Sequence, residues 1–340
     1  MDLSTFWFCL IAVLWIGYFV LEGFDFGVGV LVGTISQDDT DRRVVINTIG
    51  PVWDGNEVWL ITAGGATFAA FPEWYATLFS GFYLPLLAIL VALIVRGVAF
   101  EYRGKVDTLD WRRGWDRAIF FSSVLPALLW GVAFANIVRG VPLDADFEFT
   151  GSVLDLLSPY ALLGGLVTLS LFCLHGAVFV SLKTDGEVRH RAREIAQRLA
   201  PVAVVLAAGF LVWTQVLTGN AGSAFLSTGA AGALVAAALL VRTPREGWAF
   251  AATAATIALA VASLFVALFP DVLPSTVGGN SLTVDNASSS PYTLKVMSWV
   301  AAFGTPLVVA YQAWTYWVFR QRISRKHIVG APAGEPTPVP

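Results

Sequence analysis

The sequence predicts an all-α protein embedded in a lipid bilayer. Its 340 residues are 56% hydrophobic and only 13% charged, with a mean hydropathy of +0.70. Apolar runs long enough to cross the hydrocarbon core of a membrane recur along the whole chain. The connectors between these runs are short, which argues against a separate soluble domain.

Nine apolar stretches qualify as candidate membrane helices. The second of them opens with acidic residues, so the count falls to eight if residues 52–71 do not cross. We expect one membrane domain over residues 1–327, built as two bundles of about 5–138 and about 158–320. Residues 328–340 are rich in proline and are expected to form a disordered cytoplasmic tail. The nine stretches are 5–33, 52–71, 75–100, 118–138, 158–182, 198–218, 224–241, 248–269 and 294–319.

The orientation of the chain follows from its lysines and arginines. With nine spans, 18 of the 21 basic residues fall on one side of the membrane. The opposite side holds only Arg139 and Lys295. Because basic connectors stay in the cytoplasm, we expect the N-terminus outside and the C-terminus inside.

Two acids stand at the start of the second apolar stretch. Asp54 and Glu57 are three residues apart, a spacing that places both carboxylates on one face of a helix. Trp53 and Trp59 flank them. Charged side chains are costly inside a membrane, so these acids are candidates for function. The alternative is that Asp54 only caps a helix at the water boundary.

Further charged residues fall at the same depth. At about 1.5 Å per residue, Glu22 and Asp25 lie in the inner half of the first helix. Arg96 and Glu101 lie in the last two turns of the third. Together with the two acids of the second stretch they form a cluster in the cytoplasmic half, which suits a proton entry path. The alternative is an ion-pair network, such as Arg96 with Asp25, that only stabilises packing.

The first helix also carries a pattern typical of close helix packing. Gly23 and Gly27 form one pair of small residues four apart, and Gly29 and Gly33 form a second. Such pairs allow another helix to approach closely.

Ligands for a haem or a metal are scarce. Of the three histidines, only His175 lies inside a span, and the only methionine after Met1 is Met297. Because haem iron takes axial His, Met, Cys or Tyr, a multi-haem centre cannot be built here. We interpret His175 as a hydrogen-bonded core residue. The sequence shows no zinc spacing, phosphate-binding loop or nucleophile motif, so we expect no metal and no catalytic residue in this chain.

Several longer motifs stand out along the chain. The most specific is P-V-W-D-G-N-E-V-W-L-I-T-A-G-G-A at 51–66. Others are G-F-D-F-G-V-G at 23–29, R-G-V-A-F-E-Y-R at 96–103, G-V-A-F-A-N at 131–136, T-D-G-E at 184–187 and T-L-K-V-M-S-W-V at 293–300. Together these motifs resemble subunit II of cytochrome bd-type quinol oxidases, and the resemblance covers about residues 5–320.

The resemblance implies a multi-pass protein of the bacterial plasma membrane, paired with a related subunit I. That partner carries haem b, haem d and the quinol site, and the complex oxidises quinol and reduces dioxygen to water. Subunit II binds no haem in this family, packs on subunit I through its early helices and shares that subunit's two-bundle architecture. The resemblance also allows for a structural quinone and small single-helix accessory subunits; it implies no nucleic acid partner.

The resemblance also implies roles for individual residues. Asp25, Asp54 and Glu101 match the acids of a proton path proposed for the family, with Trp53 and Arg96 beside them. Glu101 departs from the aspartate that relatives often carry there. Two other classes are weighed against this interpretation. A proton-coupled transporter would show inverted repeats and broken central helices, and a bare scaffold would not explain the clustered charges.

Overall fold

The computed structural model describes residues 2–329, which are almost entirely helical. The part of the expected tail at 330–340 lies outside the described residues, and Ile328 and Val329 belong to a short helix. The helices are α1 (Leu3–Ile35), α2 (Asp39–Ile49), α3 (Trp53–Ala70), α4 (Pro72–Gly81), α5 (Tyr83–Tyr102), α6 (Leu109–Arg139), η1 (Val153–Leu156), α7 (Pro159–Lys183), α8 (Gly186–Thr218), α9 (Ala221–Leu240), α10 (Glu246–Leu268), α11 (Pro291–Val318) and α12 (Arg325–Val329).

Many of these helices begin where the sequence supplies a cap. Asp2, Asp38 and Ser158 accept hydrogen bonds from backbone N–H groups in the first turns of α1, α2 and α7. Asn220 and Ser290 do the same for α9 and α11. These side chains satisfy N–H groups that have no partner inside the helix. Proline also opens α4, α7 and α11, where its missing N–H costs nothing.

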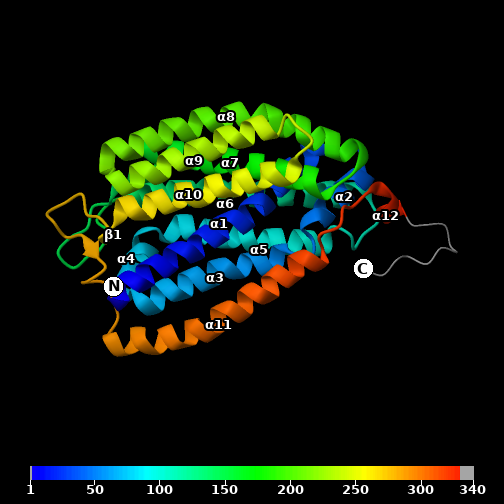
Figure 1. Ribbon diagram of the computed structural model, residues 1–340. Helices are drawn as coiled ribbons and strands as arrows, with labels where there is room; N and C mark the ends of the chain where they lie inside the picture. The colour runs from blue at the N-terminus through cyan, green and yellow to red at the C-terminus, as the bar shows by residue number, and fades with distance from the viewer. Residues whose placement is uncertain (1, 330–340) are drawn as a thin grey trace.

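The long helices run side by side, with α1 in the middle (Figure 1). α1 packs against α3, α6, α7 and α10, and α8 and α9 lie further out. Close approaches between backbones make this packing tight. A Cβ atom added at Gly27 would lie 1.8 Å from the carbonyl oxygen of Phe172 on α7, and one at Gly131 would lie 2.2 Å from that of Gly164. Helices that meet at such glycines gain contact along the backbone.

Eight described helices are long and apolar enough to cross a membrane: α1, α5, α6, α7, α8, α9, α10 and α11. α3 is less apolar, because its first turns carry charged and amide side chains, but its 18 residues span about 27 Å. It lies beside α1 and α11 in the bundle (Figure 1). The N-terminal end of α1 and the segment at α12 lie at opposite ends of the molecule, as an odd number of passes requires. The arrangement therefore favours nine passes, including α3.

α11 lies against α1 and α3, on the side away from α8 and α9 (Figure 1). Its only buried residue is Leu294. Most of its surface is apolar and exposed, so lipid can cover this helix as well as protein can.

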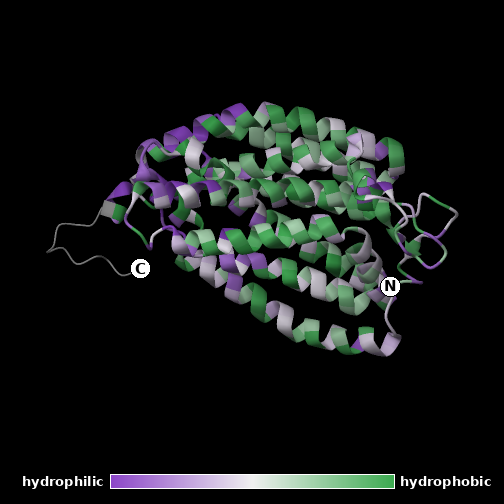
Figure 2. Cartoon of the chain, turned by 180° about the vertical axis from the view of Figure 1, so that it is seen from behind, coloured by the Kyte–Doolittle hydropathy of each residue, from purple (hydrophilic) through white to green (hydrophobic). Residues whose placement is uncertain are grey.

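The two ends of the bundle differ in polarity. Hydrophilic residues gather at the end that carries α2, α12 and the N-terminal turns of α8, whereas the middle of the bundle is mostly hydrophobic (Figure 2). The other end carries a small antiparallel pair of strands, β1 (Asp271–Leu273) and β2 (Leu282–Thr283). The basic connectors lie at the hydrophilic end, so we assign that end to the cytoplasm.

A set of ion pairs closes the cytoplasmic end; we call Asp38, Asp41, Arg191 and Arg325 the cytoplasmic clamp. Asp41 of α2 is 1% exposed and binds Arg191 of α8, while Arg325 of α12 donates to Asp41 at 2.6 Å and to Asp38 at 2.7 Å. The backbone N–H of Asp41 and the Arg325 guanidinium lower the pKa of the Asp38 carboxyl. The clamp ties α2, α8 and the segment after α11 together.

Candidate functional site

Five polar residues from three helices meet in the cytoplasmic half of the bundle, and we call them the acid cluster. α1 contributes Glu22 and Asp25, α3 contributes Asn56 and Glu57, and α5 contributes Arg96. All but Glu57 are fully buried, and the side chain of Glu57 is 22% exposed. Their convergence agrees with the sequence prediction that these charged residues share one depth.

Arg96 is the only cation of the acid cluster. Its Nη1 binds Glu22 in a short ion pair and Glu57 at 3.2 Å. The guanidinium also lies over the rings of Phe26 and Phe100, at 4.7 and 5.4 Å from their centroids. Such stacking offsets part of the cost of burying the charge. The partners of Arg96 are therefore Glu22 and Glu57, whereas the sequence suggested Asp25.

Asp25 has a different kind of partner. Its Oδ2 accepts a hydrogen bond of 2.6 Å from the Asn56 side-chain amide. Its Oδ1 is buried and has no hydrogen-bond partner among the described residues, and the same holds for Oε2 of Glu22. An amide stabilises a carboxylate without neutralising its charge. The bonding of Asp25 therefore leaves one oxygen open to a proton.

Asn56 extends the acid cluster to a fourth helix. Its Oδ1 accepts from Nε2 of Gln312 at 3.0 Å and from the hydroxyl of Tyr316 at 2.8 Å, both on α11. The sequence prediction missed all three residues. A signal was present, because Asn56 stands between Asp54 and Glu57, and Gln312 interrupts an apolar helix.

The remaining predicted residues lie at the cytoplasmic edge of the cluster. Asp54 is exposed in the first turn of α3, and its side chain makes no capping hydrogen bond, because Val52 is the residue at the cap position. Glu101 is exposed in the last turn of α5. Trp53 is half-buried and packs on Phe100, with ring centroids 5.4 Å apart. The capping alternative for Asp54 is therefore wrong.

The predicted packing glycines act within the chain. Cβ atoms added at Gly23 and Gly27 would collide with Phe172 of α7, and one at Gly29 would lie 2.1 Å from Oγ of Ser123 on α6. Gly33 differs, because no described atom lies within 4 Å of its Cβ position. The close approaches of the first three glycines are thus to α6 and α7 of the same chain.

His175 and Met297 are the two potential haem ligands that the sequence singled out. His175 is fully buried, with Nδ1 2.6 Å from the Thr253 hydroxyl and Nε2 3.1 Å from the Val20 carbonyl oxygen. Both ring nitrogens are thus engaged, which confirms a hydrogen-bonded core histidine. Met297 is partly buried at the outer end of α11, and it is distant from Cys173 in the sequence.

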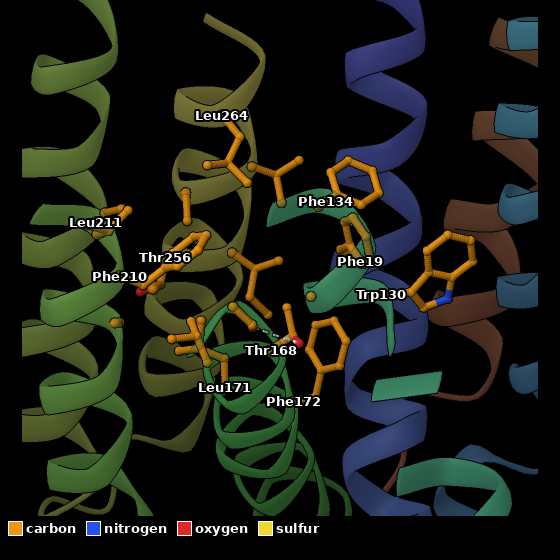
Figure 3. Close-up of a pocket in the computed structure, with 18 of the residues that line it drawn as sticks. Phe19, Trp130, Phe134, Thr168, Leu171, Phe172, Phe210, Leu211, Thr256 and Leu264 are labelled. Carbon is orange, nitrogen blue, oxygen red and sulfur yellow. Dashed lines mark hydrogen bonds between the residues drawn. The ribbon is translucent and has the colours of Figure 1, made fainter. Parts of the chain in front are cut away.

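A cavity of about 60 Å³ lies between α1, α6, α7, α8, α9 and α10 (Figure 3). Among the described residues that line it, none is His, Met, Cys or Tyr. The hydroxyls of Thr168 and Thr256 bond to backbone carbonyls, at 2.6 Å to Ala127 and 2.9 Å to Ala252. This cavity therefore does not fit a haem held by an axial side chain.

Comparison with known proteins decides the family. Residues 3–319 match the family described as cytochrome bd terminal oxidase subunit II. The chain belongs to the cytochrome bd terminal oxidase subunit II family. A relative from Bacillus subtilis, cytochrome bd ubiquinol oxidase subunit 2, is 45% identical over 96% of this chain and 98% of its own length. Cytochrome bd-I ubiquinol oxidase subunit 2 of Escherichia coli K12 is 39% identical over 95% of each chain.

A solved structure shares the fold of this subunit II. A chain in the structure of bd oxidase from Geobacillus thermodenitrificans matches 94% of this chain and 99% of its own length, with a TM-score of 0.78 and 18% identity. This subunit II is thus part of a quinol:oxygen oxidoreductase in a bacterial plasma membrane, in complex with a subunit I. Membership in this family argues against the transporter alternative.

Proposed function

We propose that this subunit conducts protons from the cytoplasm toward the haem-bearing subunit I, with Asp54 as the entry group and Asp25 as the inner carrier. The observation that supports this role best is the state of Asp25: it is fully buried, bound by a neutral amide and left with one oxygen unbonded. A buried carboxyl that lacks a cationic partner of its own can change its protonation without breaking an ion pair.

The positions of the acids support an ordered route. Asp54 is exposed at the start of α3, and Glu57 lies one helical turn deeper, close enough to Arg96 for an ion pair. Asp25 lies beside Asn56 at the same level, and Glu22 lies one turn nearer the membrane centre on α1. The exposure of the carboxyl groups thus falls from Asp54 to Glu57, and Asp25 and Glu22 are both fully buried.

We also infer that the haems of the complex are held by subunit I. Two observations support this inference. Both ring nitrogens of His175 are hydrogen-bonded, and the described lining of the cavity between α1 and α6 to α10 contains no His, Met, Cys or Tyr. We further infer that α3 faces the partner, since Gly64 and Gly65 of this helix have no described atom within 4 Å of their Cβ positions. Open glycines on an outer helix face permit close approach of another helix.

The test uses the purified oxidase complex. Asp25→Asn and Asp54→Asn retain size and hydrogen bonding but cannot carry a proton, so we expect each to slow oxygen reduction by about tenfold or more. The reduced-minus-oxidised spectrum measures the haems and should be unchanged. Glu101→Gln is the matched control and should have a milder effect, because Glu101 is exposed where water can bypass it.

Two results would contradict this function. Full turnover in both aspartate variants would show that oxygen reduction does not depend on them. Loss of haem together with turnover would show that the acids only stabilise the assembly.

A further inference from the structure

We propose that Gln312 and Tyr316 of α11 are positioning residues for Asp25, acting through the side chain of Asn56. The inference rests on the proposed function, because it takes Asp25 to be a proton carrier. It extends that function by naming two side chains that favour the ionised form of Asp25.

The side chain of Asn56 lies between two sets of partners. On one side its Nδ2 donates to Asp25 at 2.6 Å and to the Leu21 carbonyl oxygen at 3.4 Å. On the other side its Oδ1 accepts from Gln312 and Tyr316. Asn56 is fully buried, so it has no exposed surface through which to exchange these partners.

This arrangement fixes which end of the amide faces Asp25. A reversed Asn56 would point its own oxygen at the Asp25 carboxylate and at the Leu21 carbonyl, and acceptors placed together repel each other unless one carries a proton. The donors on α11 favour the unreversed orientation, because a reversed amide would require Gln312 to reverse as well and the Tyr316 hydroxyl to accept instead of donate. Two donors to the Asn56 oxygen therefore favour the orientation in which the Asn56 NH₂ group donates to the ionised Asp25 carboxylate.

The consequence for proton transfer follows from the same geometry. Without the α11 donors, Asn56 can reverse and accept a hydrogen bond from protonated Asp25, which stabilises the protonated form. The carrier would then release its proton more slowly. The other titratable or charged groups around Asp25 are Glu22 of α1, Glu57 of α3 and Arg96 of α5, with His175 of α7 bonded to α1 at Val20. None of these is altered in the variants below.

The experiment compares Tyr316→Phe, Gln312→Leu and the double variant in the complete oxidase complex. Tyr311→Phe is the matched control: it makes the same change on the same helix at a tyrosine that is 64% exposed. Three quantities are measured: turnover, the haem spectrum, and the infrared C=O stretching band of the protonated Asp25 carboxyl at fixed pH. That band is assigned by its loss in Asp25→Asn.

We expect the double variant to lose about three- to tenfold in turnover, the range for losing a hydrogen bond to a charged or polar network. Its Asp25 band should grow while its haem spectrum stays unchanged. The single variants should show smaller changes of the same sign, because each keeps one donor. Tyr311→Phe should match the unmodified complex in all three measurements.

The outcomes separate this proposal from the proposed function. An unchanged Asp25 band and normal turnover in the double variant would overturn the positioning role, even if Asp25→Asn remains slow. Full turnover in Asp25→Asn would remove the proton role, while a larger Asp25 band in the double variant would still support the positioning. If the double variant does not assemble, the single variants decide: a larger band in both supports the proposal and no change in either overturns it.

Discussion

The two acids of α1, Glu22 and Asp25, have different kinds of partner. Glu22 receives the cation itself, in a contact that is fully buried on both sides, whereas Asp25 receives only an amide. An ion pair in a medium of low dielectric holds both charges in place, since removing either leaves the other unpaired. At the scale of single residues, Glu22 is therefore paired with a buried cation, whereas Asp25 is hydrogen-bonded to a neutral amide.

A residue-scale prediction concerns the glycines of α1. Gly27→Ala should destabilise the subunit by about 1–3 kcal/mol or more, because the added Cβ would meet the backbone of α7 at Phe172, which cannot yield as a side chain can. Gly33→Ala is the matched control on the same helix and should leave stability unchanged or raise it slightly. The measurement is the thermal unfolding midpoint of the complex in detergent; equal midpoints for the two variants would contradict the close approach.

Particular residues show how far sequence reasoning extends. Charge and helical spacing predicted that Asp25, Glu57 and Arg96 share a depth, because depth follows from position along a helix of known rise. They could not predict which acid pairs with Arg96, since that depends on how α1, α3 and α5 are rotated relative to one another. Nor could they place Gln312 near Asn56, because the two lie 256 residues apart and α11 packs out of sequence order.

At the scale of helices, α11 is attached by polar contacts rather than by a buried face. At its outer end Nε1 of Trp7 donates to the Leu294 carbonyl at 3.2 Å, and in its inner half Asn56 binds Gln312 and Tyr316. Beyond its inner end, Nζ of Lys183 donates to the carbonyl oxygens of Phe319 and Gln321. The cytoplasmic clamp then fixes the chain that follows.

The element-scale prediction concerns Asp41, which binds both arginines of the cytoplasmic clamp. Asp41→Asn should destabilise the subunit by about 1–3 kcal/mol, because Arg191 and Arg325 lose a buried carboxylate while remaining partly solvated themselves. The measurement is protease cleavage of the segment around α12, which should become faster. Asp110→Asn is the control, since Asp110 is 98% exposed and meets Arg113 only at 3.9 Å. Equal cleavage rates in both variants would argue against the clamp.

At the scale of the whole molecule, the acid cluster and the apolar cavity lie in different parts of one bundle that shares α1. The cluster lies where α1 meets α3 and α5, and the cavity lies where it meets α6 to α10 (Figure 3). The buried carboxylates of α1 thus face α3 and α5, whereas the cavity beside α6 to α10 is lined mostly by apolar side chains.

The whole-molecule prediction is that this subunit, purified alone, shows no haem absorption, since its one buried histidine has both nitrogens engaged. The visible spectrum of the isolated chain measures this, with the complete complex as the positive control. His175→Leu in the complex should leave the haem content unchanged. A haem signal from the isolated subunit, or loss of haem in His175→Leu, would be incompatible with the assignment of all haems to subunit I.

The late position of α11 in the chain has a consequence for biosynthesis. α11 follows the other long helices of residues 2–329, so each of those helices can enter the membrane before Gln312 and Tyr316 leave the ribosome. A nascent chain that stops before Pro291 holds Asp25 and Asn56 but lacks both hydrogen-bond donors to the Asn56 oxygen. The hydrogen bonds from α11 to Asn56 can therefore form only after the rest of the acid cluster has been synthesised.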